Sequence, residues 1–241
     1  MTGRGETDIG KIVERARGLH SWTMRPREAV EAQRRLAPQV ILEDAPSLRA
    51  MRTLAAFDIS AKRFGRTLYA AAVAWDLRSG EPLQVSRAAV AASFPYVPGL
   101  LSFREMPAML EALAGLREVP DLVLCDAHGL IHPRLFGLAC HAGLATGIPT
   151  IGCAKSHLVG EHGEPGPEKG SRCVVKVDGR KAGYVLRSRR GSKPIYVSPG
   201  HRISCETAAL IILSLLGKFR IPDPLKAAHN EAIAFMRDME P

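Results

Sequence analysis

The apolar positions change their spacing several times along the chain, and each change predicts a different element. Strand-like apolar stretches occupy residues 52–59, 67–76 and 83–90, with short breaks between them that contain turn-forming residues. Successive strands with short connections are typical of an antiparallel meander. We therefore expect three consecutive antiparallel strands in this part of the chain.

The next part of the chain alternates between helical and strand-like patterns. Residues 104–117 carry leucines at helical spacing, and residues 133–146 predict a second helix with Pro133 in its first turn. The short apolar runs 121–126 and 148–153 predict buried strands. Strand, helix and strand with short links favour parallel pairing. Ligands of such sheets bind beyond the carboxyl ends of the strands, so the residues there are candidates for a site.

The two ends of the chain complete the expected architecture, which is of the α/β class. Residues 1–22 are polar and irregular, and we expect a flexible, loosely held extension there, followed by a single domain over residues 23–241. The glycine- and proline-rich stretch 160–170 is expected to be a surface loop. The remaining predicted elements are a helix from Pro26 to about Pro38, strands at 172–178, 182–187 and 194–197, and helices at about 205–216 and 224–238.

Composition limits the class of protein. The chain has 241 residues, of which 46% are hydrophobic, and this is enough for a sizeable core. No apolar run approaches the roughly 20 residues that span a membrane, and the N-terminus lacks the apolar core of a signal peptide. Five cysteines without a C-x-x-C pair argue against a disulfide framework and against a zinc site made of cysteine alone. The default expectation is a cytoplasmic monomer with no membrane partner.

Three acidic residues lie where separate elements should meet. Asp58 closes the first strand-like run, Asp126 closes the run that starts at residue 121, and Glu105 opens a helical stretch. Carboxylates held together repel one another unless a cation neutralises them, so a cluster favours a Mg²⁺ site. A net charge of +9 around it suits metal-dependent cleavage of a phosphodiester. The alternative is a set of solvated turn acids on an ordinary basic surface.

Histidines near these acids have several possible roles. His128 and His132 are four residues apart, but Gly129 and Pro133 indicate a loop rather than the continuous helix that zinc binding at this spacing requires. We expect these two histidines to shape the loop or to support the site from behind. His229, in the last predicted helix, could approach the acids or be structural.

An aromatic segment and several basic residues suggest contact with nucleic acid. Two prolines stiffen the segment 94–99, so Tyr96 could wedge between stacked bases; the alternative is a loop whose aromatics pack on the core. Lys155 follows a strand-like run and could contact a phosphate, or it could be an ordinary exposed lysine. Arg189 and Lys193 belong to a basic stretch that could follow a phosphate backbone or be a solvated face.

In this order, the segments resemble the endonuclease V family. The likeness runs from about residue 27 to residue 238, and the Pro-Tyr-Val-Pro-Gly segment that leads to Phe-Arg-Glu is highly specific. The matching pieces are Phe57-Asp58-Ile59-Ser60, the segment from Phe94 to Glu105, Asp126-Ala127-His128-Gly129 through His132-Pro133-Arg134, Pro149 to Ser156, and Val197-Ser198-Pro199-Gly200-His201.

The resemblance implies a ribonuclease H-like fold, a mixed β-sheet flanked by helices, and an endonuclease that acts on DNA containing deoxyinosine. The implied reaction is a Mg²⁺-dependent nick at the second phosphodiester bond 3′ of the lesion, with Mn²⁺ as a substitute. The implied catalytic residues are Asp58, Glu105, Asp126, Lys155 and His229, with Asp58, Glu105 and Asp126 as metal ligands. The implied lesion and DNA contacts are Pro95, Tyr96, Pro98, Gly99, Arg104, Ala127, His128, Gly129, Ser156, Arg189 and Lys193.

One residue departs from the family pattern. The family usually has glycine where this chain has Ala127. If the position has a positive φ or touches the lesion, alanine costs on the order of 1 kcal/mol, and if φ is negative the change is harmless. Two other functions stay open: an endoribonuclease specific for inosine on the same scaffold, and a lesion-binding protein that has lost catalysis.

Overall fold

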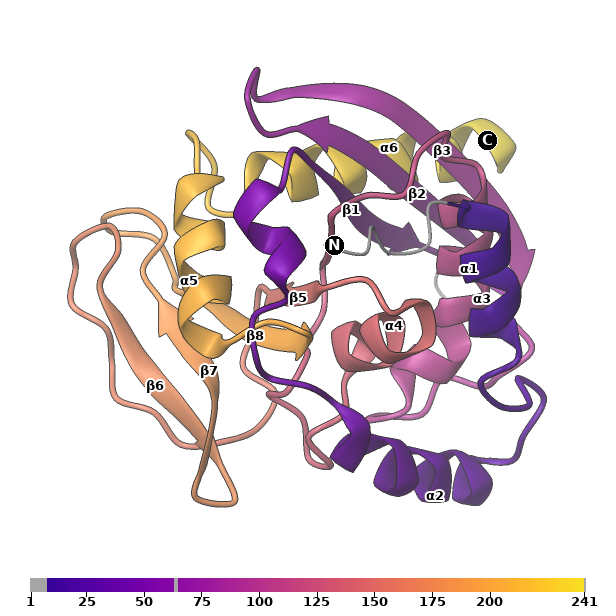
Figure 1. Ribbon diagram of the computed structural model, residues 1–241, viewed down its shortest axis with the longest axis horizontal. Coiled ribbons are helices and arrows are strands. Elements are labelled where there is room, and N and C mark those ends of the chain that lie inside the picture. The colour runs from indigo at the N-terminus through magenta and orange to yellow at the C-terminus, as the bar shows by residue number, and fades with distance from the viewer. Residues whose placement is uncertain (1–7, 63–64, 241) are drawn as a thin grey trace.

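The computed structural model of the protein describes residues 8–62 and 65–240. Within these residues the strands form one mixed sheet in the order β3-β2-β1-β4-β5-β8-β7-β6 (Figure 1). The strands are Thr53–Ser60 (β1), Thr67–Asp76 (β2), Glu81–Ala91 (β3), Leu122–Cys125 (β4), Thr150–Ala154 (β5), Arg172–Val177 (β6), Arg180–Leu186 (β7) and Ile195–His201 (β8). The helices are Ile9–Arg17 (α1), Pro26–Leu36 (α2), Leu101–Ala114 (α3), Leu138–Thr146 (α4), Cys205–Ser214 (α5) and Asp223–Met239 (α6), with 3₁₀ turns at Ala37–Gln39 (η1) and Pro46–Ala50 (η2).

The order of the strands brings two carboxyl ends together. β1, β2 and β3 pair antiparallel in sequence order, as their apolar runs predict. β4 pairs parallel to β1, with Phe57 opposite Cys125, and β5 pairs parallel to β4. The N–H of Asp126 donates to the carbonyl oxygen of Phe57 at 3.1 Å, so the ends of β1 and β4 lie side by side.

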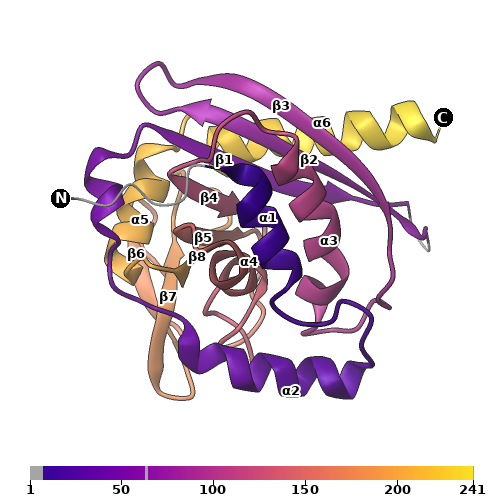
Figure 2. The ribbon, with the colours of Figure 1, turned by 45° about the vertical axis from the view of Figure 1, so that its right-hand side comes forward.

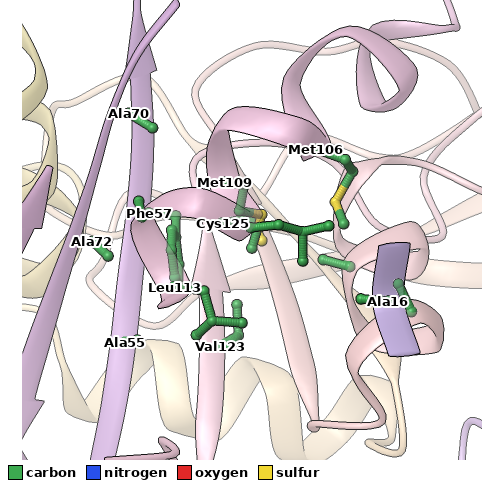
Figure 3. Packing of buried hydrophobic residues seen from close by; sticks show 14 of the residues in the cluster. Ala16, Ala55, Phe57, Ala70, Ala72, Met106, Met109, Leu113, Val123 and Cys125 are labelled. Atoms are coloured by element: carbon green, nitrogen blue, oxygen red, sulfur yellow. The ribbon is translucent and has the colours of Figure 1, made fainter. Parts of the chain in front are cut away.

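Helices cover both faces of the central strands. Ala55 and Phe57 of β1 pack with α1, α3 and α4 (Figure 3), whereas Leu54 and Ala56 pack with α5 and α6 on the opposite face. Successive side chains of a strand point to opposite faces, so a wholly apolar run needs cover on both. Figure 2 shows α1, α3 and α4 together on one side of the central strands. The strand ends that carry the acids are therefore fixed by packing from both sides.

The prediction of an irregular, loosely held segment over residues 1–22 is wrong for the part that the structure describes. Asp8 caps α1 by accepting from the N–H of Gly10 at 2.9 Å. Ile12, Val13 and Ala16 are buried in the same core as α3 and α4, and Figure 3 labels Ala16 there. Ile9, Leu19 and Trp22 also pack, partly buried, against this core, and the polar residues between these positions obscure the apolar pattern in the sequence. Residues 1–7 lie outside the described residues.

Two predicted helices begin at other residues. α3 begins at Leu101 rather than at residue 104, so Glu105 lies one turn inside the helix. α4 begins at Leu138 rather than at Pro133, because the intervening residues form turns in which Leu135 has a φ of 51°. Among the described helices, none combines the length and the apolar character needed to cross a membrane.

Candidate active site

Three side chains from three elements converge at the carboxyl end of the central strands. Asp58 comes from β1, Asp126 directly follows β4, and His229 comes from α6. One ligand atom from each lies within 4.8 Å of the others, and all three side chains are partly exposed. Nδ1 of His229 lies 2.6 Å from Oδ2 of Asp58. Two carboxylates and an imidazole offer oxygen and nitrogen donors, which suit a divalent cation such as Mg²⁺ or Mn²⁺.

Glu105 lies near this group but is not one of the three converging residues. Burial raises the pKa of Glu105 to about 8, with a smaller contribution from the charge of Asp58 and a further one from Asp126. The pKa of Asp126 is also raised, first by burial and then by Asp58, while Lys155 opposes the change. Acidic groups that disfavour one another's ionisation are ionised together at lower cost when a cation lies between them, so this cluster fits a cation.

Lys155 and Arg220 connect the cluster to the basic segment. The ammonium of Lys155 forms an ion pair with Oδ2 of Asp126, and the guanidinium of Arg220 donates to the carbonyl oxygen of Lys155. Arg220 also donates to the carbonyl oxygens of Lys193 at 2.9 Å and Pro194 at 2.8 Å. Arg220 was not predicted as a site residue, because its partners are main-chain oxygens far away in the sequence.

The segment 94–99 presents one exposed aromatic ring on a fixed base. Tyr96 is 72% exposed, whereas Phe94 is 1% exposed and packs with α2 and with Phe103 of α3. The alternative in which every aromatic packs on the core therefore holds for Phe94 and Phe103 but not for Tyr96. Nη1 of Arg104 donates to the carbonyl oxygen of Phe94 at 2.8 Å, so in this structure Arg104 supports the loop from behind.

The end of this loop is fixed by a hydrogen-bond network whose members are far apart in the sequence and were not predicted. The carbonyl oxygen of Gly99 accepts from Nε2 of Gln33 at 3.0 Å and from Nη2 of Arg134 at 2.7 Å, and Nε2 of His132 lies 3.0 Å away. Gly99 has a φ of 76°, and a Cβ there would lie 2.8 Å from the Arg134 guanidinium. His132 is buried, with its pKa lowered to about 4 chiefly by burial. Its Nδ1 accepts from the N–H of Arg134 at 3.2 Å, so His132 contacts its own loop as well as the end of the segment 94–99.

A cavity of about 470 Å³ lies between the aromatic loop and the ends of β4 and β5. Its wall includes Asp126 and Lys155, so it opens directly onto the cluster. The other lining residues are Gln33, Tyr96, Val97, Pro98, Gly99, Leu101, Ser102, Ala127, His128, His132, Gly137, Leu138, Ala154, Ser156, His157 and Leu158.

The loop after β4 forms part of this wall. Ala127 is not among the residues with positive φ, so the conformational penalty considered above does not arise. Gly129 is required, because a Cβ there would lie 2.2 Å from the carbonyl oxygen of Pro199. Nε2 of His128 lies 3.0 Å from the carbonyl oxygen of Ser156, and its buried Nδ1 has no partner. Burial lowers the pKa of His128 to about 4, so its ring is neutral.

The basic stretch divides into two kinds of residue. Arg189 and Lys193 are exposed and remain candidates for phosphate contact. Arg187 instead donates to the carbonyl oxygens of Gly166 at 3.2 Å and Pro165 at 3.0 Å, and so holds the loop 160–170. Arg189 makes one longer contact, from Nη1 to the carbonyl oxygen of Lys218 at 3.4 Å, and charge alone did not distinguish its role from that of Arg187.

Comparison with known proteins identifies the family. The family model described as Endonuclease V matches residues 34–230. The chain belongs to the endonuclease V family, and it is therefore a nuclease. It is 50% identical to Endonuclease V of Thermus thermophilus over 211 residues, which cover 86% of this chain and 92% of that protein. It is 43% identical to Endonuclease V of Myxococcus xanthus over 216 residues, covering 90% of this chain and 92% of the relative.

Solved structures of the endonuclease V family have the same fold. Endonuclease V of Streptomyces avermitilis is 35% identical, with a TM-score of 0.85 over 92% of this chain and 97% of that chain. Endonuclease V of Ciona intestinalis is 26% identical, with a TM-score of 0.76 over 89% of this chain and 98% of that chain. The Ciona protein was solved in complex with a 24mer DNA containing an inosine followed by a ribo-adenosine. The expected ribonuclease H-like architecture is confirmed.

Proposed function

We propose that this protein is a Mg²⁺-dependent repair endonuclease that nicks DNA containing deoxyinosine at the second phosphodiester bond 3′ of the lesion, leaving 3′-hydroxyl and 5′-phosphate ends. The observation that carries the proposal is the convergence of Asp58, Asp126 and His229 next to a cavity bordered by the Tyr96 loop. Family membership and the inosine-containing ligand of the Ciona relative support the choice of substrate.

The side chains of the cluster have different roles in the proposed hydrolysis. Asp58, Asp126 and His229 would hold the cation, and Glu105 is close enough for its charge to interact with theirs. When bound, Mg²⁺ or Mn²⁺ neutralises charge on the phosphate and lowers the pKa of a water molecule. The hydrogen bond between His229 and Asp58 fixes both groups before substrate arrives. Lys155, paired with Asp126, keeps an ammonium where negative charge develops during the displacement.

Recognition uses the loop and the cavity. A damaged base has to leave the stack before an enzyme can read it, and weakly paired bases leave at the lowest cost. The exposed ring of Tyr96, held on a stiff base, fills the vacated place in the stack. The displaced hypoxanthine enters the cavity, whose wall includes Ala127 and His128. Gly129 lies behind this wall, because its N–H donates to Oγ of Ser198 at 2.8 Å. Arg189 and Lys193 contact the phosphate backbone.

A nicking assay tests the proposal. The purified protein is given Mg²⁺ and labelled duplexes that differ only in one deoxyinosine, with Asp58→Ala as the inactive control. We expect a single nick one nucleotide beyond the lesion with the wild-type protein and none with the variant, while gel-shift binding of the lesion duplex is retained. Loss of binding together with nicking would assign Asp58 a structural role, and no nick by the wild-type protein would overturn the proposal.

Cleavage of inosine in RNA is the second candidate function. The observation that favours it is the ligand of the Ciona relative, which carries a ribo-adenosine directly after the inosine. The same assay with inosine-containing RNA separates the two, because cleavage of RNA without cleavage of DNA would assign the site to RNA. Lesion binding without any cleavage would indicate a binding protein that has lost catalysis.

A further inference from the structure

The link between α5 and α6 (Figure 1) presents an exposed aromatic ring with a lysine on either side of it in the sequence. Phe219 is 39% exposed and lies between Ser214, where α5 ends, and Asp223, where α6 begins. Nζ of Lys218 lies 5.3 Å from the centroid of this ring, and Nζ of Lys226 lies 5.8 Å from it. The face of an aromatic ring attracts a cation, so one ring helps to hold two ammonium groups in place.

The two ammonium groups are not neutralised by a neighbouring carboxylate. Across residues 8–62 and 65–240, the lysines that form ion pairs are Lys62, Lys155 and Lys181. The acid that is nearest in sequence, Asp223, is turned towards Gly217, where a Cβ would lie 2.0 Å from its Oδ2. Two like charges that share one ring repel each other, and a bound anion relieves this repulsion. The pair Lys218 and Lys226 is therefore suited to phosphate.

This pair of lysines is connected to the acidic cluster in two ways. Lys226 comes three residues before His229 on α6, so the two side chains are neighbours on the surface of one helix. The guanidinium of Arg220 donates to the carbonyl oxygen of Lys155, and the ammonium of Lys155 pairs with Asp126. The link between α5 and α6 therefore borders the cluster.

The link and the cavity lie on different sides of Lys155. Lys155, Ser156 and Asp126 line the cavity, whereas none of residues 217–226 does. Arg220 contacts Lys155 at its carbonyl oxygen, while the ammonium of the same lysine points to Asp126 on the cavity wall. The proposed function places the lesion in the cavity and the nick at the cluster. The strand beyond the nick then leaves the cluster on the side away from the cavity.

We propose that Lys218 and Lys226 bind phosphates of the substrate strand on the 3′ side of the nick, and that Phe219 is a positioning residue that holds their ammonium groups. Phosphate contacts fix the register of a strand without reading its bases, so this pair holds the part of the strand that carries no lesion. The inference rests on the proposed function, because the lesion in the cavity defines which side of the cluster is 3′.

The test removes negative charge from chosen parts of the substrate. One deoxyinosine duplex has ordinary phosphates throughout, and a second has uncharged methylphosphonates at the linkages just beyond the nick. A third has the same number of methylphosphonates 5′ of the lesion, and kcat/KM for nicking is measured in Mg²⁺ on each. With the wild-type protein, we expect kcat/KM on the second duplex to be about tenfold lower than on the first, the order of two exposed charge contacts.

Removing both lysines should abolish this sensitivity. The double variant Lys218→Ala, Lys226→Ala is expected to lower kcat/KM on the ordinary duplex by about tenfold, and methylphosphonates beyond the nick should then have little further effect. The plot of log kcat/KM against log salt concentration should become flatter by about one to two units, since each phosphate contact contributes about 0.9 to its slope. Methylphosphonates 5′ of the lesion should affect the variant and the wild-type protein equally.

Two further variants separate position from charge. Phe219→Leu keeps an apolar side chain but removes the aromatic face, so we expect a several-fold loss on the ordinary duplex with the salt slope retained, whereas Phe219→Tyr should behave as wild type. The control is Arg49→Ala combined with Arg78→Ala. It removes two exposed positive charges near the start of β1, at the other end of the sheet from the acids, and is expected to leave kcat/KM on all three duplexes unchanged.

Each outcome decides between the inference and its basis. Equal kcat/KM on the first two duplexes with the wild-type protein would overturn the inference, and this comparison does not depend on the folding of any variant. A double lysine variant as sensitive as the wild type to neutral linkages beyond the nick would also overturn it. An equal loss in the arginine control would show that the lysines act only through net charge. If the wild-type protein nicks none of the duplexes, the proposed function itself fails.

Discussion

The acidic cluster and the cavity wall lie next to each other but are built in different ways. Asp58, Asp126 and His229 are partly exposed charged or ionisable groups, and burial together with their mutual charge raises the pKa of Asp126 and of the nearby Glu105. The cavity wall relies on buried groups such as Gln33 and His132 that are fully engaged in hydrogen bonds. A metal site needs unneutralised charge that a cation completes, whereas recognition needs donors and acceptors whose directions are already fixed.

The largest expected effect is on the acidic cluster, where the phosphodiester would be cleaved. Asp126→Asn removes one charge from the cluster and the partner of Lys155, and we expect nicking to fall by about 10³-fold, since a metal ligand contributes several kcal/mol to the transition state. Lesion binding should change little. Asp178→Asn, at an exposed turn outside the cluster, is the matched control for nicking rates. A comparable loss of nicking rate in Asp126→Asn and Asp178→Asn would contradict the assignment of the chemistry to the acidic cluster.

The second effect is a dependence of stability on pH in the absence of divalent cations. Folding raises the pKa of Glu105 from 4.5 to about 8, so the folded protein keeps a proton that the unfolded chain releases between these values. The free energy of unfolding should therefore fall as pH rises through this window in EDTA, lowering the thermal midpoint by a few degrees. Mg²⁺ should restore the midpoint, and Glu105→Gln should flatten the slope. An unchanged slope in the variant would assign it to other groups.

The third effect belongs to the exposed ring of the loop. Tyr96→Ala removes a stacking surface, so we expect binding to deoxyinosine duplex to weaken by about tenfold, within the range of one base–aromatic contact. Binding to undamaged duplex should change much less, as measured by fluorescence anisotropy on both duplexes. Tyr96→Phe keeps the ring and should behave as wild type. Equal weakening on both duplexes would argue against a wedge.

A smaller effect tests the buried network behind the loop. Gln33→Leu removes one of the donors to the carbonyl oxygen of Gly99 while filling similar space. We expect a several-fold rise in KM with little change in kcat, because a neutral hydrogen bond contributes about 1 kcal/mol and the cluster is untouched. Gln39→Leu, on the exposed turn beyond α2, is the control. A fall in kcat alone would show that the two regions are coupled.

The smallest effect is expected at the residue that departs from the family pattern. Ala127→Gly should change kcat/KM by no more than a few-fold, because φ at this position is not positive and alanine carries no backbone penalty. Steady-state nicking of the deoxyinosine duplex measures this. A large gain in rate would mean that the methyl group crowds the base in the cavity.

Much of the fold could be predicted from the sequence because its central strands are apolar runs, and such runs have to be buried in the core. The sequence predicted the antiparallel meander of β1, β2 and β3 and the parallel pairing of β4 with β5. It did not predict that β1 and β4 are neighbours, and the approach of Asp58 to Asp126 depends on that pairing. α1 was missed because three buried residues in a polar segment leave a weak pattern. The start of α4 was misplaced because a turn fixed by close packing of Gly137 against His128 carries little local pattern.

By itself, the sequence determined the strands and the acids at their ends, since apolar periodicity is a local property. Only the tertiary structure decided which groups complete the site. The approach of His229 to Asp58, the engagement of Gly99 by Gln33 and Arg134, and the hydrogen bonds of Arg220 to Lys155 and Lys193 join residues far apart in the sequence. Hydrogen-bond direction depends on partners and burial, and these exist only once the chain has folded.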